Sequence, residues 1–499
     1  MGCVLAALTL SACGSTVSGS NAVSTGPGTN EFGTGQATQT GALGSTTSAG
    51  GATGSQSTTS GGNSGTGSFS SDPGATTSTN TSTSGATLPP TGVKARGVTA
   101  TTLTVGVPVP TDTNAVANSF GIKGAGSVSP QDILAAVVND VNKSGGILGR
   151  KLVAYQHTYN LASYISNPSQ VDSEICADFR DDHKVFAVLY NMPSPDIRSC
   201  TAKMGAPLIV LDGLLAYMQE SLYKENGANY LFAPTSITAE RLAQLFIKSL
   251  MARTFTQKWN ITAGGPGVTP MRLGLIHADT PDQNALYALY AKELAKYGLK
   301  FTDTATYTPN VQAGLAATQS AVLKFRSDGI THVFGASAFF LQDAENQHYR
   351  PRYAYLPGLG AIGVANSPSA QLNGALTVGW APSSDVASAQ DPGDTPGSKH
   401  CRAVMSAVGL GTTNRADLEI MYSVCDTIYS LRTALTNSRE ASVSGIRRGY
   451  ESLGSSFPTS LTFNAVLGPD RHYGIDSVRD MAYDTSCSCL KYTSKTNRS

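Results

Sequence analysis

The stretch ILAAVVNDVNKSGGILGRK, Ile133–Lys151, decides the fold. Its first half continues a helix that we expect to begin at Ser129, an N-cap residue, and to end near Asn142. The Gly pair at 145–146 can adopt the positive φ that the end of a helix demands. The chain is therefore predicted to reverse tightly here and to continue as a strand over Lys151–Tyr159.

Strands and helices alternate outward from this stretch, which is the pattern of βαβ units and a parallel sheet. The series restarts after a long predicted helix over Thr238–Phe255. We therefore expect an α/β chain of two lobes, each a mostly parallel sheet flanked by helices. Two further short strands are expected near Ser460–Phe463 and Ser477–Asp484. The main predicted strands are Thr101–Val109, Lys151–Tyr159, Val185–Tyr190, Pro207–Leu211, Asn229–Phe232, Met271–His277, Lys300–Tyr307, Thr331–Ala336, Tyr353–Leu356 and Ala375–Trp380.

The amino-acid composition divides the chain into a polar N-terminal part and a body. The 84 residues Gly14–Gly97 contain 19 Gly, 16 Ser and 19 Thr, too little apolar surface to offset about 1–2 kcal/mol of backbone entropy per ordered residue. We expect a disordered tether over 14–97 and a folded body over 98–499. The first lobe is expected at about 98–236 and 385–455, and the second at about 237–384 and 456–499.

Charge and motifs exclude several classes of function. The 499 residues carry 35 basic and 34 acidic side chains, whereas a nucleic-acid partner normally requires a basic field. No Gly-x-Ser-x-Gly elbow, His-Glu-x-x-His or Walker loop occurs, so we expect no catalysis. The seven His are scattered and none lies at ligand spacing from a Cys pair, so we expect no metal and no cofactor.

The N-terminus resembles the end of a bacterial lipoprotein signal. A short apolar run, Val4–Leu10, precedes Ser11, Ala12 and Cys13, and it is too short to span a membrane. The resemblance implies cleavage before Cys13 and lipidation of that residue, although Met1–Cys3 lack the usual Lys or Arg. We expect a signal peptide over 1–13 and an extracytoplasmic protein that meets the membrane only through this lipid.

Six cysteines of the body form an even set, which in an exported protein indicates disulfides. Six cysteines allow 15 pairings. The favoured scheme joins Cys176 to Cys200 and Cys401 to Cys425. It leaves open whether Cys487 and Cys489 pair with each other or stay as free thiols.

The Asn-x-x-Gly-Gly-Ile-x-Gly-Arg run within Ile133–Lys151 resembles the first helix and turn of type I periplasmic binding proteins. These include the leucine/isoleucine/valine-binding receptors of ABC transporters, and the order of elements is similar over Val98–Tyr492. The resemblance implies two hinged lobes that close on a small solute, after which the closed form docks on a membrane permease. It predicts a monomeric receptor that delivers its solute to an ABC permease. A receptor that reports to a signalling partner instead would share the fold and the cleft.

Open α/β sheets bind ligands at the carboxyl ends of their strands, so the candidate residues follow the predicted strands. The predicted ligand-binding set is Tyr159, Asn191, Ser194, Asp212, Thr235, Asp279, Ser337 and Phe339. Other residues at strand ends are Asp112, Asn160, Ser236, Tyr307 and Gly358.

The amino-acid clamp of the resembled family is altered at both ends. Ser194 matches a hydroxyl position, but Pro195 and Asp196 occupy the neighbouring places. The acid that holds a ligand ammonium is missing from Pro357–Gly360, after the strand at Tyr353–Leu356. We therefore do not expect amino-acid specificity. Asp196, Asp212 and Asp279 could bind a hydroxyl-rich or cationic solute beside Tyr159, Tyr190 or Phe339, or could instead cap helices and turns.

Overall fold

The fold is described from a computed structural model, which covers residues 95–119, 121–191, 193–211, 217–224, 230–308 and 311–499. The predicted signal peptide, the predicted lipidation site Cys13, Asp212 and nearly all of the predicted tether lie outside these residues. The guanidinium of Arg96 donates hydrogen bonds to the carbonyls of Phe179 at 2.9 Å and Val185 at 3.2 Å. The end of the predicted tether is thus attached to the body before residue 98.

The stretch that decides the fold forms the expected helix and turn. Helix α3, Pro130–Lys143, is capped by the Ser129 side chain, and Gly145 and Gly146 have φ of 92° and 71°. A Cβ on Gly146 would lie 2.0 Å from the Arg150 carbonyl oxygen, so only glycine fits. The Asn142 side chain hydrogen-bonds both backbone groups of Leu152 and so holds the start of the next strand against the helix.

All strand pairs in the first sheet are parallel, and its order is β13-β5-β4-β3-β1-β2. Successive side chains of its central strands point to opposite faces of the sheet, and both faces are buried. Leu189, Ile209 and Phe232 join one apolar cluster, whereas Val188 and Val210 join another. Two buried faces explain the apolar character of these strands. The strands are β1 Thr102–Pro110, β2 Lys151–Tyr159, β3 Ala187–Tyr190, β4 Leu208–Val210, β5 Leu231–Ile237 and β13 Tyr473–Ile475.

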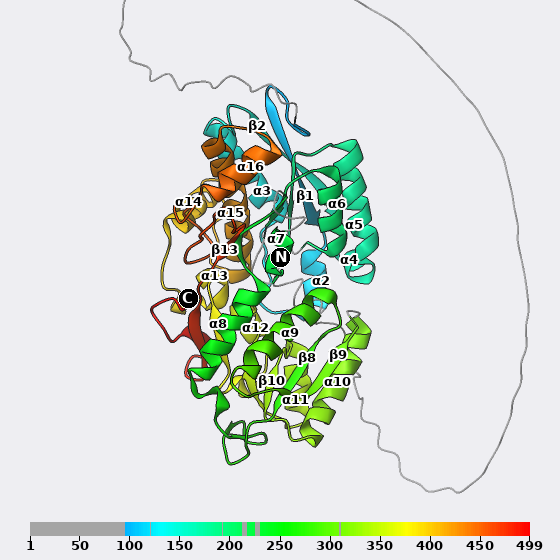
Figure 1. Ribbon diagram of the computed structural model, residues 1–499, viewed down its shortest axis with the longest axis vertical. Coiled ribbons are helices and arrows are strands. Elements are labelled where there is room, and N and C mark those ends of the chain that lie inside the picture. The colour runs from blue at the N-terminus through cyan, green and yellow to red at the C-terminus, as the bar shows by residue number, and fades with distance from the viewer. Residues whose placement is uncertain (1–94, 120, 192, 212–216, 225–229, 309–310) are drawn as a thin grey trace, which may run out of the picture. The chain divides into compact units, whose positions relative to one another are not determined.

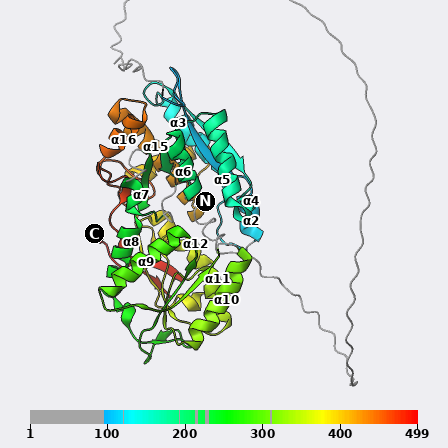
Figure 2. The same cartoon turned by 45° about the vertical axis from the view of Figure 1, so that its right-hand side comes forward.

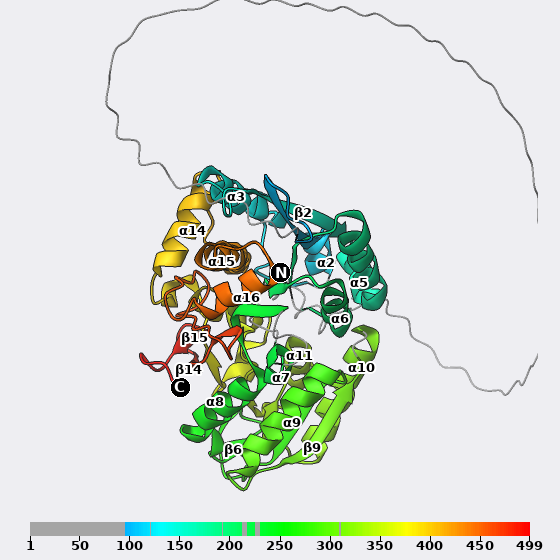
Figure 3. The ribbon, with the colours of Figure 1, turned by 45° about the horizontal axis from the view of Figure 1, so that its top comes forward.

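Helices cover both faces of the first sheet. On one side α5 and α6 lie side by side next to β1, as Figure 1 shows. On the other side α15 packs against α3, α14 and α16, and Figure 3 looks down its axis. The helices of the first side are α4 Leu161–Ser166, α5 Pro168–Ala177, a π-helical turn Asp178–Asp182, α6 Pro195–Met204 and α7 Glu220–Lys224. Those of the second side are α3, α14 Pro396–Ser406, α15 Arg415–Ser438 and α16 Val443–Glu451.

The second sheet has the order β15-β14-β12-β11-β10-β8-β9. Its first five strands in the chain are parallel, and β14 and β15 add an antiparallel edge. Figure 2 shows α10 and α11 side by side on this lobe. The strands are β8 Leu273–Ala278, β9 Phe301–Tyr307, β10 His332–Phe334, β11 Arg352–Ala354, β12 Leu376–Gly379, β14 Arg479–Asp484 and β15 Cys489–Tyr492. The helices are α8 Ala239–Met251, α9 Pro281–Ala295, α10 Val311–Ser327, α11 Ala338–Asn346 and α12 Gly360–Ala365.

The chain passes between the two sheets three times within one compact unit: after β5, after β12 and after β13. The expected second-lobe segment 456–499 is wrong for β13, because Tyr473 and Ile475 pair with β5 of the first sheet. The strand expected near Ser460–Phe463 does not form either. The Asp426 carboxylate accepts the backbone N–H groups of Ser460 and Leu461 at 2.6 and 2.9 Å, which holds this segment as a loop.

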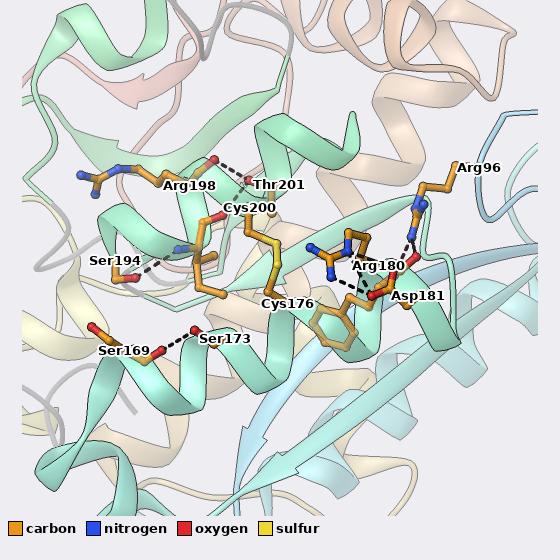
Figure 4. Close-up of a disulfide and its surroundings, with 12 residues drawn as sticks. Arg96, Ser169, Ser173, Cys176, Arg180, Asp181, Ser194, Arg198, Cys200 and Thr201 are labelled. Carbon is orange, nitrogen blue, oxygen red and sulfur yellow. Dashed lines mark hydrogen bonds and ion pairs between the residues drawn. A yellow bond between two sulfur atoms is a disulfide. The ribbon is translucent and has the colours of Figure 1, made fainter.

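The three disulfides confirm the favoured pairing. Cys176–Cys200 joins α5 to α6, as Figure 4 shows, and Cys401–Cys425 joins α14 to α15. Cys487 pairs with Cys489 in the turn between β14 and β15, which decides the alternative that the sequence left open. Among the described residues, no helix combines the length and apolar character needed to cross a membrane.

Candidate functional site

The carboxyl ends of the strands in the two lobes meet around Tyr217, which lies between β4 and α7. Its hydroxyl donates a hydrogen bond to the carbonyl of Pro357, after β11 of the second lobe. Its ring centroid lies 6.5 Å from that of Trp380, after β12, in an edge-on arrangement. Strand ends of both lobes are therefore in contact here, where an α/β fold places ligands.

Helix α15 extends this junction with a line of buried polar side chains. Thr427 Oγ1 donates a hydrogen bond to the Leu211 carbonyl at 3.2 Å, at the end of β4. Ser423 lies one turn earlier, and Glu419 one turn earlier again, where it accepts a hydrogen bond from Ser384 Oγ at 2.6 Å. Ser384 belongs to α13, Pro382–Asp385, on the crossing from the second lobe. One face of α15 thus connects the end of β4 to this crossing.

Five buried polar atoms around this junction have no hydrogen-bond partner within the described part of the chain. We call their residues the interlobe site. Thr235 and Ser423 are each only 1% exposed. A buried polar group without a partner costs about 1–3 kcal/mol, so such groups normally meet water or a ligand. The five atoms are Asn191 Oδ1, Thr235 Oγ1, Trp380 Nε1, Ser383 Oγ and Ser423 Oγ.

Two residues of the predicted ligand-binding set, Asn191 and Thr235, lie in the interlobe site. Sequence reasoning missed Ser383 and Ser423, because they come from a crossing and a helix, and it missed Trp380, because the predicted strand Ala375–Trp380 contained that residue. Polar residues within the buried face of α15 are the signal that could have found Ser423.

Other predicted site residues stabilise helix ends. Ser194 caps α6 by accepting the Ile197 N–H at 3.2 Å, and Ser337 caps α11 by accepting the Phe340 N–H at 3.2 Å. Asp279 is exposed and accepts a hydrogen bond from the Asn284 side chain at 2.8 Å. Both hydroxyls have local structural partners, unlike those of the interlobe site.

The two predicted aromatic residues, Tyr159 and Phe339, are half-buried. The Tyr159 ring lies 5.6 Å from that of Tyr164, and burial raises the pKa of the Tyr159 phenol far above its usual range. Phe339 lies in the first turn of α11. Neither residue contributes an unpartnered polar atom to the interlobe site.

A buried carboxylate, Asp172 on α5, organises the loop after β3. It accepts hydrogen bonds from the hydroxyls of Tyr190 and Ser194, each at 2.5 Å. Burial raises the pKa of Asp172. The sequence offers no sign of this role, since Asp172 lies in the middle of a helix far from any strand end. Figure 4 shows Ser194 at the N-cap of α6 and Arg198 on that helix, near the disulfide that ties α6 to α5.

An ion pair joins the lobes beside this loop. The two terminal nitrogens of Arg198, on α6, each lie 3.3 Å from an oxygen of Asp282, in the first turn of α9. Arg198 Nη1 also donates a hydrogen bond to the Pro193 carbonyl at 2.8 Å. This pair favours an arrangement in which the lobes are together. No group of three or more potential metal ligands occurs among the residues that the structure describes.

Comparison with solved structures identifies the fold as that of the type I periplasmic binding proteins. A branched-chain amino acid ABC transporter protein from Thermus thermophilus, solved with valine, matches with a TM-score of 0.55 and 14% identity over 80% of this chain and 96% of its own. A possible leucine/isoleucine/valine-binding protein from Rhodopirellula baltica matches with a TM-score of 0.54 and 14% identity, over 79% of this chain and 97% of its own. An ABC transporter solute-binding protein from R. palustris, in complex with 4-hydroxybenzoate, matches with a TM-score of 0.54 and 13% identity, over 80% of this chain and 97% of its own.

The likeness to these proteins is one of fold, because identity is so low. No protein-family model matches the sequence, and no curated protein matches it either. The chain therefore has the two-lobed α/β architecture that its sequence predicts.

Proposed function

We propose that the protein is an extracytoplasmic receptor that binds a small solute between its lobes and delivers it to an ABC transporter permease, without catalysis. The carrying observation is the interlobe site. Five unpartnered polar atoms lie where the strand ends of a type I periplasmic binding fold converge. In such a fold, hinge closure couples occupancy of the cleft to a change of shape that a partner can recognise.

The structural neighbours support a small-molecule ligand. One was solved with valine and another with 4-hydroxybenzoate. Hinge motion would involve the three crossings between the sheets, and the Arg198–Asp282 pair would favour the closed form.

Anchoring by a lipid on Cys13 belongs to the same proposal. A Gly/Ser/Thr-rich tether after the lipid would let the body reach both solute and permease. Metabolic labelling with a fatty acid should mark the wild-type protein and not Cys13→Ala. Equal labelling of the two would contradict the anchor and leave the binding role standing.

A thermal-shift screen of the full chain against a broad metabolite library tests the binding role. A solute present at 100 times its dissociation constant stabilises the folded state by about 2.7 kcal/mol and should raise the melting temperature visibly. At least one class of solute should do so, with one molecule bound per chain. No shift with any sugar, amide, amino acid, carboxylate or polyamine would contradict the receptor role.

A further inference from the structure

We propose that the solute is uncharged and rich in hydroxyl or carbonyl groups, and that it is held by hydrogen bonds from the interlobe site. This inference rests on the proposed function, and it names the chemical class of the ligand. It rests on one difference: the neutral polar groups of the site have no hydrogen-bond partner, whereas charged groups around the site already have partners.

The unpartnered groups of the interlobe site are all neutral. Three are hydroxyls, which both donate and accept hydrogen bonds. The amide oxygen of Asn191 only accepts, and the indole N–H of Trp380 only donates. A solute that bears several hydroxyls or carbonyls can satisfy both kinds of group.

Asp196, in the first turn of α6, is exposed, and six other carboxylates on neighbouring described elements already have partners. They accept hydrogen bonds from backbone N–H groups, from hydroxyls or from Arg198, so they would have to give up these bonds to hold a cationic solute. Asp112 is an example, since it accepts the N–H groups of Leu161 and Ala162 at 2.5 and 3.3 Å. The others are Asp172, Asp282, Asp385, Asp417 and Glu419.

The two neighbouring guanidinium groups are occupied as well. Arg198 is shared between Asp282 and the Pro193 carbonyl. Arg415, on α15, donates to the carbonyls of Pro382 and Val386 at 2.6 and 2.8 Å and pairs with Asp391 at 2.9 Å. A solute carboxylate would therefore compete for a cation that already has partners, whereas a neutral solute requires no ionic partner.

Three solute panels, each used at the same concentration with the full chain, test the ligand class. The neutral panel holds D-glucose, glycerol and acetamide. The carboxylate panel holds L-valine, L-glutamate and 4-hydroxybenzoate, and the cationic panel holds putrescine and spermidine. We expect the melting temperature to rise with the neutral panel.

Two serines on α15 form a matched pair of variants for the solute that gives the largest shift. Ser423→Ala removes a hydroxyl of the interlobe site and should weaken binding about three- to tenfold, with unchanged unfolding. Ser430→Ala, two turns along, removes an equally buried hydroxyl that is bonded to the Thr427 carbonyl at 3.0 Å and lies 3.0 Å from the Tyr450 hydroxyl. It should lower stability and leave the affinity unchanged.

Each other outcome overturns a stated part of the inference. Shifts confined to the carboxylate or cationic panel would refute the neutral class while the receptor role stands. A neutral solute that binds Ser423→Ala as tightly as it binds the wild type would refute this assignment of the site. No shift in any panel, together with a silent metabolite screen, would contradict the receptor role and the inference with it.

Discussion

Two neighbouring groups of polar side chains at the ends of the first sheet have opposite hydrogen-bonding states. The cap cluster, Asp112, Asn160, Asp172 and Ser194, bonds to helix N–H groups and to hydroxyls of the same lobe. The interlobe site consists of similar residue types, yet its polar atoms have no partner among the described residues. Residue type and place at a strand end therefore do not distinguish these two groups, whereas counting hydrogen bonds does.

The largest effect is expected from Asp172→Ala in the cap cluster. This change leaves the buried hydroxyl of Tyr190 and that of Ser194 without their acceptor and should cost about 2–4 kcal/mol of unfolding free energy. Chemical denaturation measures it. If the cost stayed below about 0.5 kcal/mol, the cap cluster would not be structural and the comparison would fail.

The buried carboxyl of Asp426 is expected to make the stability of the fold depend on pH. Burial raises the pKa of this carboxyl to about 7, although it accepts two backbone N–H groups. In the unfolded chain the carboxyl ionises near its ordinary pKa of about 3.9. Its contribution to stability is therefore complete below about pH 4 and is lost as the pH rises toward 7. Asp385 has a raised pKa of about 7 from the same cause and adds in the same direction.

The variant Asp426→Asn cannot ionise and isolates this effect. Its stability deficit relative to the wild type should shrink between pH 5 and pH 8, by an amount of about 1 kcal/mol or more. Urea unfolding at the two pH values measures the deficit. A deficit that is equal at both would show that Asp426 is ionised in the folded protein across this range.

A smaller effect is expected from Ser337→Ala, because this predicted ligand-binding residue caps α11. Loss of an N-cap costs about 1 kcal/mol. Solute affinity, measured by calorimetry, should remain unchanged. A strong loss of affinity with normal stability would restore Ser337 as a ligand contact.

The smallest effect on stability is expected from Arg198→Ala, since Asp282 is partly exposed and such ion pairs contribute less than about 1 kcal/mol. Its consequence is conformational. Small-angle X-ray scattering of the solute-free chain should show a larger radius of gyration in the variant. The charge swap Arg198→Asp with Asp282→Arg should return the wild-type radius of gyration. If the wild type, Arg198→Ala and the charge swap all had the same radius, the ion pair would not hold the lobes together.

The fold was predictable because its signals are local. The helix and Gly-Gly turn in Ile133–Lys151, together with the alternation of strands and helices, indicate two parallel sheets. The missed strand β13 has three residues, with a glycine at its centre, and no periodic pattern can appear in so short a segment. Its partner β5 lies more than 200 residues away in the chain, and only the folded structure brings them together.

The site was predictable only in part, because the sequence shows that a side chain is polar but not whether it has a partner. Ser194 follows β3 and Thr235 lies near the carboxyl end of β5, and the two residues look alike in sequence. The first lies against a helix N-terminus, whereas the second is buried at the interlobe site. Ser423 is placed by the packing of α15 across the end of β4, which no local pattern encodes.

The chain contains two tryptophans, and they allow the central claim to be tested directly. Trp380 belongs to the interlobe site, whereas Trp259 is buried in the second lobe with its indole N–H bonded to the Arg350 carbonyl at 2.9 Å. The measurement is a fluorescence titration of Trp259→Phe and Trp380→Phe with the solute that gives the largest thermal shift. We predict a saturable change from Trp259→Phe, in which Trp380 alone emits, and none from Trp380→Phe. A change from Trp380→Phe alone, with Trp259→Phe silent at saturating solute, would place the ligand away from the interlobe site and contradict the account.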